Sequence, residues 1–136
     1  MPSAFAGILV AFLLSALACN APAAADPPRS AVRGASDYAS YCAPCHGSRG
    51  GGDGPLAQLL LPRPARHSDA AFMSARSDDY LVRLLKEGGP AYGKSPLMGA
   101  WGRILGDRQI RDLVAYMRSL PGDSARVSAV NTTASK

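Results

Sequence analysis

Apolar side chains recur at helical spacing in two stretches of the chain. Residues 107–120 place five of them on one face, namely Ile110, Leu113, Val114, Met117 and Leu120. Ser77 begins the second stretch as a helix-capping residue, and a shorter apolar stripe follows it at Leu81, Leu84 and Leu85. Residues 36–41 open with Ser and Asp, a helix start signal, and predict a short helix. Since no stretch has the alternation typical of a strand, the pattern predicts an all-α fold.

The two ends of the chain differ in composition from its middle. Residues 1–25 contain no charged side chain, and the apolar run at 5–18 is typical of a secretory signal peptide. This run is shorter than the roughly 20 residues that a membrane-spanning helix needs. We expect a polar, proline-containing linker at 26–34, one domain at 35–120 and a flexible tail at 121–136.

Two processing sites fit the segment after the apolar run. Ala23-Ala24-Ala25 has the small side chains of a signal-peptidase site, which would release a soluble periplasmic protein. Residues 14–19 instead resemble a bacterial lipobox, in which the signal ends before Cys19 and that cysteine becomes the lipidated first residue. Both interpretations stay open, and both place the protein in the periplasm, either soluble or anchored to a membrane by lipid.

One short motif carries most of the chemical information in the predicted domain. Residues 42–46, Cys-Ala-Pro-Cys-His, have the Cys-x-x-Cys-His spacing at which a c-type haem is attached. The thiols of Cys42 and Cys45 can each form a thioether with a haem vinyl group, and His46 then presents an imidazole to the iron. Because the chain contains one copy of the motif, we expect one covalently bound haem.

Three other interpretations of this motif compete. A thioredoxin-like redox disulfide requires a βαβ context, which a sequence so interrupted by Gly and Pro does not offer. A zinc site requires four ligands, and the further candidates are His67 and Cys19. Chance is the third. Export favours the haem, because c-type haem is attached outside the bacterial cytoplasm and free thiols there tend to oxidise.

Several further motifs follow in a fixed order. They are Gly-Gly-Gly-Asp-Gly-Pro at 50–55, Pro-Arg-Pro at 62–64, and Ser-Pro-Leu-Met at 95–98 with Trp101 shortly after. Together with Cys42–Gly47, they make residues 41–120 resemble the monohaem class I cytochromes c of bacteria. The resemblance implies a small all-α fold in which three or more helices pack around one covalently bound haem.

The resemblance also implies roles for individual residues. His46 is the expected proximal iron ligand, and the Pro55 carbonyl is expected to accept a hydrogen bond from its other ring nitrogen. Water or another loop carbonyl is the alternative acceptor. Arg63 is expected near a haem propionate or in solvent, and Trp101, with Tyr92, near the haem edge.

Met98 is the expected sixth ligand, because it lies in a Gly- and Pro-containing loop and matches the family motif. Met73 and Met117 are expected to fill the core, and His67, in a polar loop, is expected to face water. The family more often has Pro where this chain has Gly99, and that difference predicts a looser ligand loop.

The predicted function is the transfer of single electrons in the periplasm, since His/Met ligation closes both axial positions of the iron. One alternative is a dedicated cytochrome subunit of a periplasmic dehydrogenase or sulfur-oxidising complex. Another is a haem sensor or catalyst whose sixth ligand is labile. We expect an electron carrier rather than an enzyme.

The formal net charge of +5 favours docking with an acidic redox partner. A dehydrogenase, a quinol-oxidising complex and a terminal oxidase or reductase are the partners that fit this role. Nucleic acid is not an expected partner, because the protein is exported and has no block of Lys or Arg.

Overall fold

The computed structural model describes residues 29–133 and the side chains of residues 30–122. The predicted signal peptide, both processing sites, Cys19 and residues 26–28 of the expected linker lie outside the described residues. Within residues 29–133 the chain forms α-helices and no strand, which confirms the predicted all-α class. The α-helices are α1 (Arg29–Tyr41), α2 (Ala43–His46), α3 (Ala70–Ser74), α4 (Asp78–Glu87) and α5 (Asp107–Thr133), and the short 3-10 helices are η1 (Ala57–Leu59), η2 (Pro90–Tyr92) and η3 (Trp101–Arg103).

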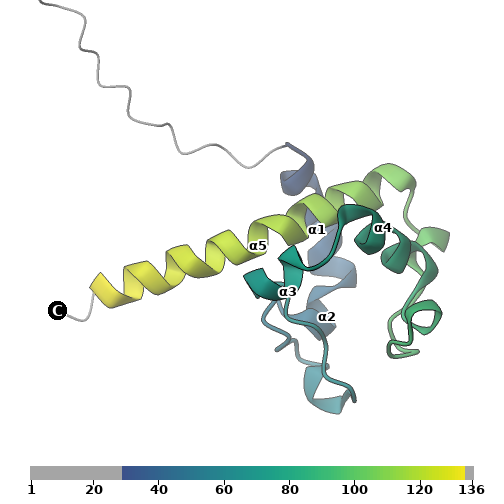
Figure 1. Ribbon diagram of the computed structural model, residues 1–136, viewed down its shortest axis with the longest axis horizontal. Coiled ribbons are helices and arrows are strands. Elements are labelled where there is room, and N and C mark those ends of the chain that lie inside the picture. Colours follow the sequence, from purple (N-terminus) through teal and green to yellow (C-terminus); the bar gives the residue numbers. More distant parts are fainter. Residues whose placement is uncertain (1–28, 134–136) are drawn as a thin grey trace, which may run out of the picture.

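Helices α1 and α5 cross and pack directly against each other (Figure 1). Gly34 lies at this crossing, where a Cβ would be 2.9 Å from the backbone nitrogen of Leu113 and would overlap the carbonyl of Asp112. Only glycine permits so close an approach. Beside it, the guanidinium of Arg33 donates two hydrogen bonds to the Asp112 carboxylate, at 2.7 and 2.9 Å. The crossing therefore fixes α1, and with it the start of the Cys-x-x-Cys-His motif.

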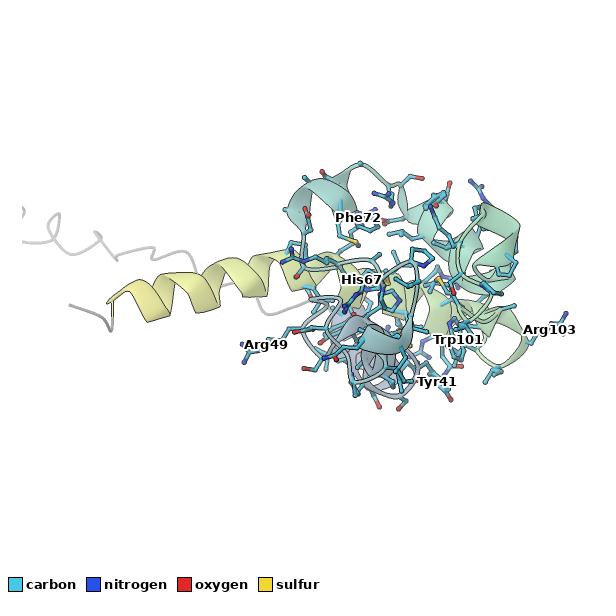
Figure 2. All side chains as sticks on the ribbon, turned by 90° about the horizontal axis from the view of Figure 1, so that it is seen from below. Tyr41, Arg49, His67, Phe72, Trp101 and Arg103 are labelled. Carbon is cyan, nitrogen blue, oxygen red and sulfur yellow. The ribbon has the colours of Figure 1, made fainter. Side chains whose placement is uncertain are left out.

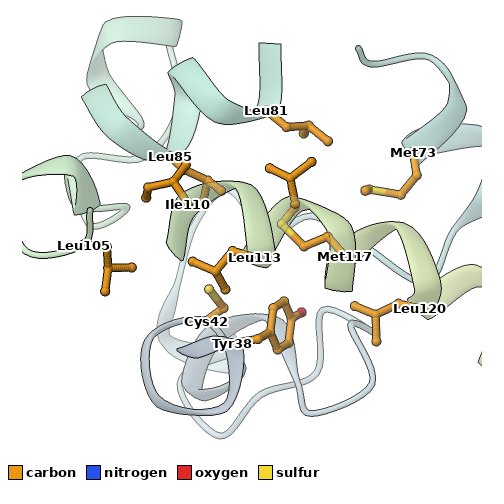
Figure 3. Close-up of a cluster of buried hydrophobic side chains, with 11 residues drawn as sticks. Tyr38, Cys42, Met73, Leu81, Leu85, Leu105, Ile110, Leu113, Met117 and Leu120 are labelled. Carbon is orange, nitrogen blue, oxygen red and sulfur yellow. The ribbon is translucent and has the colours of Figure 1, made fainter. Parts of the chain in front are cut away.

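The hydrophobic core lies between α5, α4 and the α1–α2 segment (Figure 3). All five residues of the stripe predicted at 107–120 are buried. Leu81 and Leu85 of α4 face them, and Tyr38 and Cys42 close the core from the side of α1. Met73 and Met117 are 2% and 3% exposed, so both methionines pack in the core as expected.

Helix α4 begins where its start signal predicts. The Ser77 hydroxyl accepts a hydrogen bond from the backbone N–H of Tyr80 at 3.2 Å, which caps the first turn. Gly88, with a φ of 84°, ends the helix, and its N–H donates to the Leu84 carbonyl at 2.9 Å. The helix is ten residues long, and its apolar stripe faces α5.

At both ends of the expected domain, a helix extends further than the sequence predicts. Helix α1 begins at Arg29, so residues 29–34, expected to be linker, are helical; Ala31 is buried there and Gly34 packs on α5. Helix α5 continues through Pro121 to Thr133 instead of giving way to a flexible tail at 121. Extending a helix that is already packed adds one hydrogen bond per residue and needs no apolar stripe, which explains why hydrophobic periodicity missed both segments.

No helix among the described residues is both long and apolar enough to cross a lipid bilayer.

Candidate functional site

A cavity of about 350 Å³ lies between the Cys-x-x-Cys-His motif, α4 and two loops at 60–67 and 94–101. Tyr41, His67, Phe72 and Trp101, from four different segments, all line it, and Figure 2 shows them around the centre of the domain. Arg49 and Arg103 point away from it (Figure 2). Most of the wall is apolar, and its aliphatic part is formed by Leu60, Leu81, Leu84, Leu85, Leu97 and Met117.

One helical turn brings the three motif side chains to this cavity. The N–H groups of Cys45 and His46 donate to the Cys42 carbonyl at 3.1 and 2.8 Å, and Pro44 fits the first turn, where its missing N–H is not needed. Gly47, with a φ of 80°, ends the turn. Cys42, Cys45 and His46 consequently all line the cavity, from one rigid piece of backbone.

No disulfide joins the two cysteines of the motif. Burial raises the pKa of the Cys42 thiol to about 12, with smaller contributions from Asp37 and Cys45. The Cys42 thiol therefore stays protonated near neutral pH, unlike the low-pKa thiol of a redox-active disulfide. Within residues 29–133, no three His, Cys, Asp or Glu side chains are grouped so that they could hold a bare metal ion.

The His46 ring is held by a backbone carbonyl, but not by the one we expected. Its Nδ1 lies 2.9 Å from the carbonyl oxygen of Ala65, which can only accept, so Nδ1 donates and Nε2 keeps its lone pair. The expected acceptor, the Pro55 carbonyl, is not the partner, and Pro55 is exposed. Another loop carbonyl was the alternative, and Ala65 is that carbonyl. Burial lowers the pKa of His46, so its ring stays neutral.

The glycine-rich loop explains why Ala65 is the acceptor. The N–H groups of Gly54 and Leu56 donate to the carbonyls of Cys45 and Pro44, at 3.2 and 2.9 Å, which holds the Gly54–Pro55 turn against the motif backbone. The loop also packs on the segment that contains Ala65: the Ser68 N–H donates to the Gly50 carbonyl at 3.0 Å. This contact brings the 65–67 segment to the imidazole.

His67 is buried, which corrects the expectation that it faces water. It is 6% exposed, and its ring is stacked on that of His46, with centroids 4.2 Å apart and planes 17° from parallel. Its Nδ1 is hydrogen-bonded to the Tyr38 hydroxyl at 2.9 Å. Burial, with a smaller contribution from His46, lowers the pKa of His67 to about 3. The sequence interpretation relied on the polar neighbours Arg66 and Ser68. In a loop, the polarity of the neighbouring residues does not show whether a side chain is buried.

Met98 lines the cavity together with the motif side chains, as does Trp101. The loop that carries Met98 is tied to the end of α4, where the Gly89 N–H donates to the Met98 carbonyl at 2.8 Å. Within the loop, the N–H of Met98 donates to the Ser95 carbonyl at 3.1 Å. Despite Gly99, the backbone around Met98 is therefore held at two points.

The structure brings only some of the residues predicted near the haem to the cavity. Arg63 is exposed but lines the cavity, and the Trp101 ring packs on Tyr41 with centroids 5.3 Å apart. Tyr92 is not among the lining residues and packs instead on Tyr80, with centroids 5.5 Å apart.

Sequence reasoning missed two further cations that line the cavity, Arg76 and Lys94. The Arg76 guanidinium lies 3.5 Å from the centroid of the Phe72 ring and donates to the Phe72 carbonyl at 2.6 Å. Neither cation lies in a recognisable motif, so the sequence offered no signal for them.

The residues around the cavity fit a covalently attached haem. Two thiols and an imidazole with a free lone pair come from one turn, and a thioether sulfur comes from Met98 on a separate loop. Apolar walls suit the macrocycle, and the cations Arg63, Arg76 and Lys94 suit its two carboxylates.

Comparisons with known proteins identify the family of this chain. The family model described as cytochrome C oxidase, cbb3-type, subunit III matches residues 29–117. A curated relative from Rhizobium leguminosarum bv. viciae, described as cbb3-type cytochrome c oxidase subunit FixPc, is 32% identical over 95 residues, which make up 70% of this chain. The match covers 29% of that relative, so the chain spans less than a third of its length. The chain belongs to the family of cytochrome c oxidase, cbb3-type, subunit III, whose c-type cytochrome domain implies covalently bound haem c.

Proposed function

We propose that this chain is a periplasmic monohaem cytochrome that carries single electrons between redox partners. Cys42 and Cys45 form the thioethers, His46 is the proximal iron ligand and Met98 is the sixth ligand. The observation that carries the proposal is the tautomer of His46: its Nδ1–H is committed to the Ala65 carbonyl at 2.9 Å, which leaves Nε2 available to a metal. The two cysteines and Met98 line the same cavity.

Haem supplies an iron that alternates between the ferric and ferrous states when it is bound. The chain supplies the iron ligands and the surroundings that favour this exchange of electrons. His46 and Met98 would hold the iron through a neutral imidazole and a thioether, and the apolar walls would limit the access of water. The cations Arg63, Arg76 and Lys94 line the cavity, where they would balance the negative charge of the propionates. A site closed in this way exchanges electrons rather than binding substrates.

The proposed partner is a terminal oxidase, and the proposed role is that of a dedicated cytochrome subunit. The family match and the relative's description favour an oxidase over the dehydrogenase, sulfur-oxidising complex or quinol-oxidising complex that the sequence left open. The basic net charge of +5 suits an acidic docking face. Stable co-purification with the catalytic chain of an oxidase, retained in high salt, supports a subunit; release in salt while oxidase reduction persists supports a free carrier.

For the processing of the N-terminus, we propose lipidation at Cys19 and keep cleavage after Ala25 as the alternative. Metabolic labelling with radioactive palmitate tests it: we expect label on the wild type and none on Cys19→Ser. Label that survives the substitution contradicts lipidation at Cys19. An unlabelled wild type recovered from the periplasmic fraction with an N-terminus at Asp26 supports cleavage after Ala25 instead.

A redox titration of the purified holoprotein tests the proposed function itself. A one-electron Nernst curve and a reduced protein that does not bind carbon monoxide are the expected results. Rapid binding of carbon monoxide by the reduced wild type contradicts the closed site and supports the alternative of a sensor or catalyst with a labile sixth ligand.

A further inference from the structure

Two histidine rings lie face to face beside the cavity. The planes of His46 and His67 are 17° from parallel and their centroids are 4.2 Å apart, which is stacking distance. Both rings line the cavity, and His67 lies near the middle of the domain in Figure 2. His67 is 6% exposed, so its ring is a buried part of the domain rather than a group at the surface.

The position of His67 is itself fixed from two sides. On one side, the Tyr38 hydroxyl of α1 is hydrogen-bonded to His67 Nδ1 at 2.9 Å, and Tyr38 is 1% exposed. On the other side, the glycine-rich loop closes on the backbone of the histidine: a Cβ at Gly50 would be 3.0 Å from His67 Cβ. Tyr38 is in turn packed on Tyr116 of α5, with centroids 5.0 Å apart. The His67 ring is thus attached to the α1–α5 scaffold.

The short segment 65–67 consequently holds His46 in two different ways. The hydrogen bond from Nδ1 to the Ala65 carbonyl fixes the direction of the ring nitrogen but allows the ring to turn about that bond. The stacked ring of His67 blocks this rotation, because tilting the His46 plane would drive it into the His67 face. A hydrogen bond in the ring plane and a plate on the ring face together define the plane of the imidazole.

We propose that His67 is a positioning residue for the iron ligand: its ring, fixed by Tyr38, sets the plane of the His46 imidazole relative to the haem. The inference rests on the proposed function, in which His46 ligates the iron. The plane of an axial imidazole governs its overlap with the iron d orbitals, so groups around the ligand tune the metal without touching it. A merely structural His67 would contribute to folding but would leave the electronic structure of the iron unchanged.

Electron paramagnetic resonance of the ferric holoprotein, together with the haem-methyl proton shifts in its NMR spectrum, tests the proposal. His67→Gln keeps a hydrogen-bonding partner for Tyr38 but removes the ring, and we expect shifted and broadened g values and an altered order of the haem-methyl shifts. His67→Phe restores a plate on His46 and is expected to return both signals close to those of the wild type. Tyr38→Phe frees the His67 ring and should shift the signals in the same direction as His67→Gln, but less.

Ile110→Ala is the matched control, because Ile110 is 0% exposed in the same core but is not among the residues that line the cavity. We expect Ile110→Ala to lower the unfolding midpoint without moving the g values. The proposal is overturned if His67→Gln lowers stability like this control and leaves the g values and haem-methyl shifts at those of the wild type. Failure of the proposed function is seen separately, as a wild type that lacks covalent haem or its histidine ligand.

Discussion

Gly34 of α1 and Asp112 of α5 are in backbone contact, with no space between them for a side chain. A Cβ at residue 34 would overlap the Asp112 carbonyl and lie 2.9 Å from the Leu113 nitrogen. Neither helix can move aside to make room for a side chain, because Ile110, Leu113 and Val114 on the same face of α5 are all buried. This crossing determines where Tyr38 and Cys42 lie. It therefore fixes the part of the cavity wall that the Cys-x-x-Cys-His motif forms.

Gly34→Ala should therefore destabilise the holoprotein by about 3 kcal/mol, at the upper end of overpacking costs, because the helices must separate. Urea unfolding followed by circular dichroism measures the change. Gly122→Ala is the matched control: it makes the same substitution in α5, where the added Cβ has nothing within 4 Å, and should be neutral or stabilising. Equal stability of the two variants would contradict the tight crossing.

The stability of the crossing should also depend on pH. The hydrogen bonds from Arg33 hold the pKa of Asp112 below its ordinary value of 3.8, so the ion pair contributes fully above that pH. The contribution is lost as the pH falls through the folded-state pKa, since the unfolded chain binds the proton more tightly. Asp112→Asn should lower the unfolding midpoint at pH 7, and its difference from the wild type should shrink below pH 3.8.

Arg33→Gln should reproduce this loss at pH 7, because it removes the main partner of the Asp112 carboxylate. Arg103→Gln, an exposed arginine that points away from the cavity, is the control and should unfold like the wild type. A constant difference between the wild type and Asp112→Asn from pH 7 to pH 2 would show that the carboxylate charge is not responsible.

Arg118 ties three elements together on the other side of the core. Its guanidinium donates to the carbonyls of Met73 and Arg76 and, at 2.8 Å, to the Asp78 carboxylate. Arg118→Ala leaves the two carbonyls without this donor, so we expect a loss of about 2 kcal/mol in urea unfolding. Arg111→Ala, an exposed arginine of the same helix, should change stability by less than ~0.5 kcal/mol. Equal effects would contradict the structural role of Arg118.

Removal of the haem should leave the domain largely unfolded. An empty cavity of about 350 Å³ costs of the order of 8 kcal/mol at ~24 cal/mol per Å³, an upper limit for a cavity with exposed residues at its rim. That is comparable with the whole stability of a typical domain, about 5–15 kcal/mol. Cys42→Ser/Cys45→Ser should show weak far-ultraviolet circular dichroism and no cooperative melting. A cooperative transition at the wild-type temperature would contradict a structural role for the haem.

The elements that carry an apolar stripe were predictable, and the helical segments without one were not. The stripes of α4 and of residues 107–120 appear directly in the sequence because one face of each helix is buried. Residues 29–34 look like a linker, since the feature that matters there is a glycine that fits against α5. The helical segment after Pro121 has no stripe to reveal it.

The candidate site divides in the same way. Cys42, Cys45 and His46 could be chosen from their residue types and spacing. Met98 could be chosen from its loop and its match to the family motif, and the structure brings all four to one cavity. The groups that position His46 could not be chosen so. Ala65 acts through its backbone carbonyl, which every residue has, and His67 acts through a stacking contact that depends on how a loop folds back.

The near-infrared absorption of the ferric holoprotein tests the central claim most directly, since a methionine–iron bond gives ferric haem a characteristic charge-transfer band. We predict that the wild type has this band, that Met98→Ala loses it while keeping the covalent haem, and that Met73→Ala retains it. Met98→Ala should then bind carbon monoxide when reduced. A band that persists in Met98→Ala, or that disappears only in Met73→Ala, would contradict the His46/Met98 carrier.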